Sequence, residues 1–66
     1  MPLIEVKLWA GLDDETVGRI IEKLTEAMCE AVGCPPEAVR VVVHEIPKNR
    51  WGVGGKQRSP KREERP

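Results

Sequence analysis

The chain has 66 residues, which is enough for one domain and too few for a large core. Chains of this size usually need a disulfide, a metal or an oligomer for stability. Two cysteines, Cys29 and Cys34, make no disulfide framework, and with His44 as the one histidine a zinc site is disfavoured. Of these three sources of stability, oligomerisation therefore remains.

Net charge is zero but unevenly distributed. Residues 1–46 carry four basic and nine acidic side chains, and residues 47–66 carry seven basic and two acidic ones. Because charged Glu5 and Lys7 interrupt any early apolar run, we expect no signal peptide. We also expect no membrane contact and a cytoplasmic location, since no apolar run approaches the length of a membrane span.

The first half of the chain predicts a strand and a helix. In residues 3–9 apolar and charged side chains alternate, which is typical of a strand with one buried face. Acidic residues at 13–15 favour a helix start, and Gly33 followed by two prolines favours its end. Between them apolar residues recur at three- and four-residue steps as one stripe: Val17, Ile20, Ile21, Leu24, Ala27, Met28, Ala31 and Val32.

The second half predicts another strand and a turn. Residues 38–46 are rich in branched apolar side chains, as in a strand covered on both faces, and the order strand, helix, strand predicts a parallel βαβ unit. The glycine-rich segment 51–55 predicts a hairpin or a close backbone approach. The predicted fold class is therefore α/β: a β-α-β protomer over residues 1–57 with a short C-terminal hairpin, an obligate oligomer, and a basic tail at 58–66.

Three residues are candidates for chemistry. Removal of Met1 would give Pro2 a free secondary amine, which is a base when neutral, and burial favours the neutral form. If Met1 stays, Pro2 lies in a peptide bond and has no basic amine. Arg40 is suited to binding a carboxylate, although an outward-facing strand residue would look the same. Trp51 is either a pocket wall or an ordinary core or interface tryptophan.

Four segments resemble 4-oxalocrotonate tautomerase subunits, in register and without gaps from Pro2 to about Gly55. They are Met-Pro-Leu-Ile-Glu-Val at the start, Gly-Leu-Asp-Asp-Glu at 11–15, Val-Arg-Val-Val-Val-His-Glu at 39–45 and Arg-Trp-Gly-Val-Gly-Gly at 50–55. Each motif is weak alone, but four in order at the family's spacing are specific.

The resemblance implies a tautomerase-type fold and a hexamer, a trimer of dimers, that needs no cofactor or metal and is either a homohexamer or a heterohexamer. The implied reaction is keto–enol tautomerisation of a dienol or 2-oxo acid such as 2-hydroxymuconate, in the catabolism of aromatic hydrocarbons. Pro2 would be the general base. Arg40 of a neighbouring subunit would hold the substrate's carboxylate end and carbonyl oxygen, and Trp51 would keep the pocket dry.

Leu12 departs from the family's pattern, which has at that position an arginine for the far carboxylate of a diacid. A monoacid substrate would need no second cation, or Arg50 or another basic residue would substitute. Alternatively, a partner chain in a heterohexamer supplies the arginine, as in heterohexameric superfamily members including a chloroacrylate dehalogenase. Dehalogenation itself ranks lower, because residues 51–53 offer no carboxylate to activate water. An inactive interaction subunit is a further possibility.

Trp9 ends the first strand close to where the pocket should lie, so it is a possible lining residue. His44 and Glu45 are most simply surface or interface groups, and Cys29 and Cys34 small structural hydrophobes.

The basic tail provides a first prediction. If it bound nucleic acid, deletion of residues 58–66 would abolish function, and binding would weaken steeply with salt. We expect no nucleic-acid partner, so an activity assay on the truncated chain should show that the deletion is tolerated.

Overall fold

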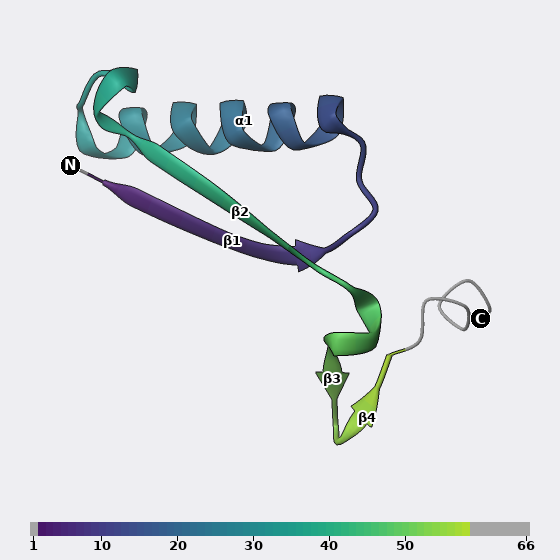
Figure 1. The fold of residues 1–66 in the computed structure, drawn as a ribbon. Helices are drawn as coiled ribbons and strands as arrows, with labels where there is room; N and C mark the ends of the chain where they lie inside the picture. Colours follow the sequence, from purple (N-terminus) through teal and green to yellow (C-terminus); the bar gives the residue numbers. More distant parts are fainter. Residues whose placement is uncertain (1, 59–66) are drawn as a thin grey trace.

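The computed structural model describes residues 2–58 (Figure 1). Met1 and the tail from Ser59 onward lie outside the described residues, and so do the predictions made for them. The main elements, in chain order, are β1 (Leu3–Trp9), α1 (Asp14–Val32), β2 (Arg40–Ile46), β3 (Gly52–Val53) and β4 (Lys56–Gln57).

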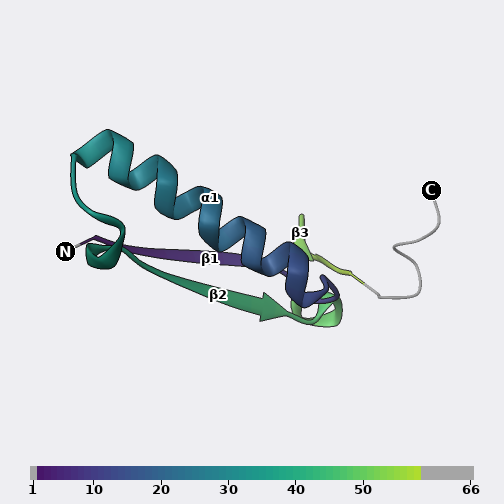
Figure 2. The ribbon, with the colours of Figure 1, turned by 90° about the horizontal axis from the view of Figure 1, so that it is seen from above.

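Strands β1 and β2 pair in parallel, as the sequence predicted. The register runs from Leu3 opposite Arg40 to Trp9 opposite Ile46. Helix α1 connects the two strands and covers one face of the sheet, as the two views together show (Figures 1 and 2). Side chains alternate along each strand, so Ile4, Val6 and Leu8 are half-buried, whereas Leu3, Glu5 and Lys7 are exposed.

Both ends of α1 are defined by local chemistry. At the start, the side chain of Asp13 accepts a hydrogen bond of 3.0 Å from the backbone N–H of Thr16. At the end, Gly33 adopts a left-handed conformation with φ of 83°, and its N–H donates to the carbonyl of Cys29 at 2.8 Å. The helix bounds predicted from capping residues are confirmed.

The second strand was predicted two residues too early. Pro36–Ala38 forms a 3₁₀ helix, η1, and the N–H of Val39 donates to the carbonyl of Pro36 at 3.1 Å. Val39 therefore ends a turn before β2 begins at Arg40. The two prolines preset this turn, which outweighs the strand preference of a valine in this position.

The glycine-rich segment forms the expected hairpin. Gly54 and Gly55 both have positive φ, 62° and 82°, as a tight two-residue turn between antiparallel strands requires. A second 3₁₀ helix, η2 (Lys48–Arg50), connects β2 to β3. The hairpin projects beyond the ends of β1 and β2, on the side away from α1 (Figure 1). The N–H of Arg58 donates to the carbonyl of Trp51 at 2.9 Å, so the ordered backbone continues through this residue.

No residue among the described ones is fully buried in the single chain. Large apolar side chains are instead open to solvent: Leu3 is 59% exposed and Val42 is 43% exposed, both on the sheet face that α1 does not cover. One helix on one face of two strands leaves the other face and both edges without partners. This exposure indicates that other copies or chains complete the core.

Within residues 2–58, α1 is not apolar enough to cross a membrane, and neither of the short 3₁₀ helices could do so.

The cap of α1 leads to a pH-dependent prediction. The hydrogen bonds from Thr16 hold the pKa of Asp13 below its ordinary value of 3.8. A carboxylate with a lowered folded pKa stabilises the fold above its unfolded pKa, and this contribution is lost as the pH falls through the folded pKa. Asp13→Ala should therefore lower the thermal unfolding midpoint at pH 7, and the gap to the parent chain should narrow below about pH 4.

Circular dichroism melts between pH 3 and 7 would measure this difference. Asp13→Ser is the matched control, because a hydroxyl also caps α1 but carries no charge. A gap between the parent and Asp13→Ala that stays constant with pH would show that the charge of Asp13 does not contribute.

The uncovered sheet face leads to a second prediction. Val42→Lys puts a charge in the middle of this face, where assembly would bury the valine. The loss of the buried valine side chain alone should make the free energy of assembly less favourable by at least about 1.5 kcal/mol per copy. Size-exclusion chromatography with light scattering should therefore show that Val42→Lys forms smaller species than the parent chain. Glu45→Lys introduces the same side chain at an exposed position on the other face of β2. Equal dissociation of both variants would argue against the uncovered face as the interface.

Candidate active site

Pro2 and Arg40 lie together at the start of the sheet. The backbone N–H of Arg40 donates to the carbonyl of Pro2 at 3.0 Å, just before the Leu3–Arg40 pair of the register. Pro2 is half-buried, and Arg40 is exposed. The parallel pairing thus brings the predicted base and the predicted carboxylate-binding residue to one end of the molecule.

Their side chains leave the sheet on opposite faces. Arg40 shares the uncovered face with Leu3, because partners in the register point to the same side. By the same alternation, Pro2 belongs with Ile4 on the side of α1. The side chain of Arg40 therefore leaves the backbone on the sheet face opposite to that of the Pro2 ring of its own chain.

Trp9 and Trp51 meet at the opposite end of the sheet. Their ring centroids are 5.7 Å apart with the planes at 83°, an edge-to-face contact of the kind that aromatic rings prefer. Trp9 is the last residue of β1, and Trp51 follows η2, which turns the chain back towards β1. Both indoles are half-buried. Trp51 thus packs against Trp9, and the two form one aromatic surface.

Two cations lie over the Trp9 ring. The ammonium of Lys48 is 5.1 Å from its centroid, and the guanidinium carbon of Arg58 is 5.7 Å away. Both distances fall in the range of cation–π contacts. Together with the two indoles, Lys48 and Arg58 form what we call the tryptophan cluster. The sequence analysis did not single out either cation, because only the path of η2 and the hairpin brings them to Trp9.

Two polar atoms at this end are covered and have no hydrogen-bond partner within the described chain. They are Nε1 of Trp9 and Nε2 of His44. His44 is opposite Lys7 in the register and so shares the uncovered face with Trp9. Sequence reasoning had treated His44 as a surface or interface group. Covered polar atoms of this kind are normally paired in a complete structure.

Leu12 lies in the loop that leaves the Trp9 end of β1, and its side chain is 41% exposed. It adds apolar surface there and no charge. The other basic residues nearby, Arg50 and Lys56, line a hollow of about 390 Å³ in the hairpin, next to Trp51.

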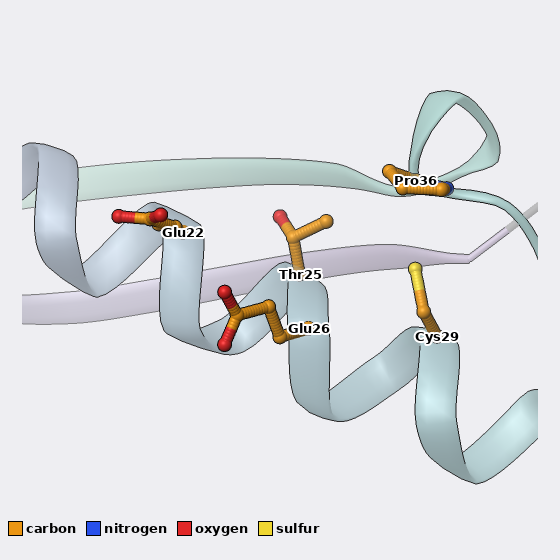
Figure 3. A pocket seen from close by; sticks show the side chains of 5 residues that line it. All are labelled: Glu22, Thr25, Glu26, Cys29 and Pro36. Atoms are coloured by element: carbon orange, nitrogen blue, oxygen red, sulfur yellow. The ribbon is translucent and has the colours of Figure 1, made fainter.

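A larger hollow, of about 470 Å³, lies along α1 (Figure 3). Its lining is Glu22, Thr25, Glu26, Cys29 and Pro36. Two carboxylates make this hollow unfavourable for an anionic substrate, and neither Pro2 nor Arg40 lines it. Burial raises the pKa of the Cys29 thiol, which leaves it protonated at neutral pH and a poor nucleophile. Among the described residues no cluster of His, Cys, Asp or Glu could hold a metal ion.

The candidate residues thus form two groups, separated along β1. Pro2 and Arg40 lie at its start, whereas Trp9, Leu12 and Trp51 lie at its end, roughly 23 Å away for a seven-residue strand. The single chain does not bring Pro2 to either tryptophan or to Leu12.

The chain matches known proteins over most of its length. Residues 2–59 match the family described as "Tautomerase enzyme". The 2-hydroxymuconate tautomerase of Comamonas testosteroni is 42% identical over 55 residues, which cover 83% of this chain and 87% of that protein. The chain belongs to the 4-oxalocrotonate tautomerase family. This membership confirms the resemblance drawn from the four sequence motifs.

Solved structures of the tautomerase family confirm the fold. A structure from a study of the 4-oxalocrotonate tautomerase isozymes of Methylibium petroleiphilum superposes with a TM-score of 0.82 at 46% identity, covering 85% of this chain and 90% of that one. A heterohexameric 4-oxalocrotonate tautomerase from Chloroflexus aurantiacus J-10-fl gives a TM-score of 0.82 at 28% identity, covering 86% and 92%. The β-α-β protomer with a short C-terminal hairpin is thus a tautomerase fold.

Proposed function

We propose that this tautomerase family member is a cofactor-independent isomerase that interconverts the keto and enol forms of 2-hydroxymuconate-like dienol acids, with the amine of Pro2 as general base. The observation that carries the proposal is the placement of Pro2. It directly precedes β1, is half-buried, and is tied through its carbonyl to Arg40 at the same end of the sheet. A relative that is 42% identical is a 2-hydroxymuconate tautomerase, which supports the substrate class.

The reaction needs one proton carrier and one fixed cation. The neutral amine of Pro2 takes the proton from the 2-hydroxyl group, so the O–H bond breaks and negative charge builds on the oxygen. The same proton is then delivered to a carbon of the dienol, and the C=C bonds shift to give the 2-oxo acid. No atom is gained or lost. A guanidinium beside the oxygen stabilises the transient charge.

The site is completed by another subunit. Because the side chain of Arg40 leaves the sheet on the face opposite to the Pro2 ring of its own chain, the arginine that acts on a given substrate comes from a neighbour. The aromatic surface of Trp9 and Trp51 also comes from a neighbour, since Trp51 lies at the far end of β1. The exposed Leu3 and Val42 provide the apolar face for such an assembly. A hexamer built as a trimer of dimers satisfies both requirements.

A heterohexamer with a second kind of chain is the alternative. Leu12 adds no charge to the loop, and the relative from Chloroflexus aurantiacus assembles as a heterohexamer. In this case the partner chain would bring the second cation, and the present chain alone would be inactive.

Variants at Pro2 and Arg40 test the proposal. On the chain with Met1 removed, verified by mass spectrometry, we expect measurable ketonisation of 2-hydroxymuconate or of a monoacid dienol. Pro2→Ala should lower kcat by about 100-fold or more, since it replaces a secondary amine with a differently placed primary one. Arg40→Ala should also lower kcat/KM strongly, because it removes the charge next to the developing oxyanion.

The assay follows the ultraviolet absorbance of the dienol. Arg19→Ala is a matched control, since it removes an exposed arginine of α1 and should leave the rate unchanged. Full activity of Pro2→Ala would contradict the proposed base. Absence of activity in the trimmed parent chain would favour the heterohexamer.

A further inference from the structure

The segment that carries Trp51 is rich in basic side chains. Residues 47–58 contain four basic side chains and no carboxylate. This segment follows β2 and forms η2 and the hairpin, next to the end of β1 (Figure 1). Because Leu12 brings no charge to the loop after Trp9, the basic side chains of this segment are candidates for binding an anionic substrate group at this end.

Two basic residues there lie over the Trp9 ring, Arg58 and Lys48, and Lys48 is the half-buried one of the two. Its ammonium is 5.1 Å from the centroid of Trp9, which is in edge-to-face contact with Trp51. A ring face engages only one side of an ammonium, so N–H donors remain for a second partner. Within residues 2–58, Lys48 forms no ion pair with a carboxylate.

Arg50 and Lys56 differ in this respect. Both are exposed, and no ring or carboxylate of the described chain fixes their charged groups. An exposed flexible cation loses more side-chain entropy when it binds a ligand than one already held on a ring. Lys48 is therefore the better prepared of the three for binding an anion.

The covered atoms Trp9 Nε1 and His44 Nε2 provide a second observation at the same place. An indole N–H can only donate, and neither atom has a partner in the described chain. Unpaired buried polar atoms carry a desolvation cost that a polar partner relieves. A carboxylate docked beside the tryptophan cluster, with a small adjustment of the side chains that cover these atoms, would supply acceptors for both Lys48 and the indole.

We propose that Lys48 binds the second carboxylate of a dicarboxylate dienol, in place of a cation at Leu12, and that Trp9 is the positioning residue that holds it. This inference rests on the proposed function, because it takes the dienol end of the substrate to lie at Pro2 of a neighbouring copy. The chain then acts as a complete enzyme on diacids such as 2-hydroxymuconate, with no partner of another sequence.

The test compares one diacid with one monoacid. Steady-state ketonisation of 2-hydroxymuconate and of 2-hydroxy-2,4-pentadienoate is measured for the parent chain and for Lys48→Met, which keeps the length of the side chain but not its charge. We expect KM for the diacid to rise about 10- to 100-fold, the range of a charge-assisted hydrogen bond. KM for the monoacid and kcat for both compounds should change less than about twofold, since only binding away from the reacting atoms is lost.

Three further variants test whether the effect depends on the charge of Lys48 and on the ring of Trp9. Lys48→Arg should restore most of the diacid preference. Trp9→Leu should weaken it without removing a charge, and Lys56→Met, the matched exposed lysine, should have no effect. Circular dichroism and size-exclusion chromatography verify that each variant folds and assembles like the parent.

The outcomes separate this inference from the function on which it rests. If the parent chain ketonises neither compound, this chain is not a complete enzyme by itself, the present inference is overturned, and the heterohexamer is favoured. If the parent chain ketonises both, and Lys48→Met leaves the ratio of the two KM values unchanged, the function stands and the role of Lys48 is wrong. Loss of the diacid preference in Arg50→Met alone would assign the carboxylate to the hairpin hollow and would also overturn the proposal.

Discussion

The structure depends on one constraint: a single helix covers only one face of a two-stranded sheet. No side chain of the described chain is fully buried, and Leu3 and Val42 lie open on the other face. The hydrophobic stabilisation available to one chain is correspondingly small, because it scales with the apolar area removed from water. A single protomer therefore contributes only part of a hydrophobic core, and an assembly completes it.

The parallel sheet also divides the candidate active site. Parallel strands run in one direction, so the residues at the start of β1, with Pro2 and Arg40, are separated from those at its end, with Trp9 and Trp51, by the length of the strand. Assembly that buries the uncovered faces also allows opposite ends of different chains to meet. Folding stability, assembly and catalysis are then linked by mass action, since anything that favours the oligomer also favours the complete site.

Much of this fold was predictable from local chemistry. Alternation defined β1, and the capping residues Asp13 and Gly33 defined α1, because these signals act within a few residues. The start of β2 was wrong by two residues, since η1 after Pro35 competes with the strand preference of Val39. The site was less predictable. Pro2, Arg40 and Trp51 were singled out by their chemistry, their roles came from the resemblance to the family, and those roles stay proposals.

Lys48 illustrates why the rest of the site could not be predicted. Thirty-nine positions separate it from Trp9 in the sequence, and only the turn of the chain through η2 brings its ammonium over the indole. The uneven charge along the sequence was visible, and Arg50 or another basic residue was one candidate for the second cation, but the sequence did not point to Lys48. The described part of that basic segment instead places two cations over the Trp9 ring, which packs against Trp51, and such an environment is suited to a carboxylate. If Lys48 binds the second carboxylate as proposed, a leucine at position 12 is compatible with a diacid substrate, because η2 instead of the loop supplies the charge.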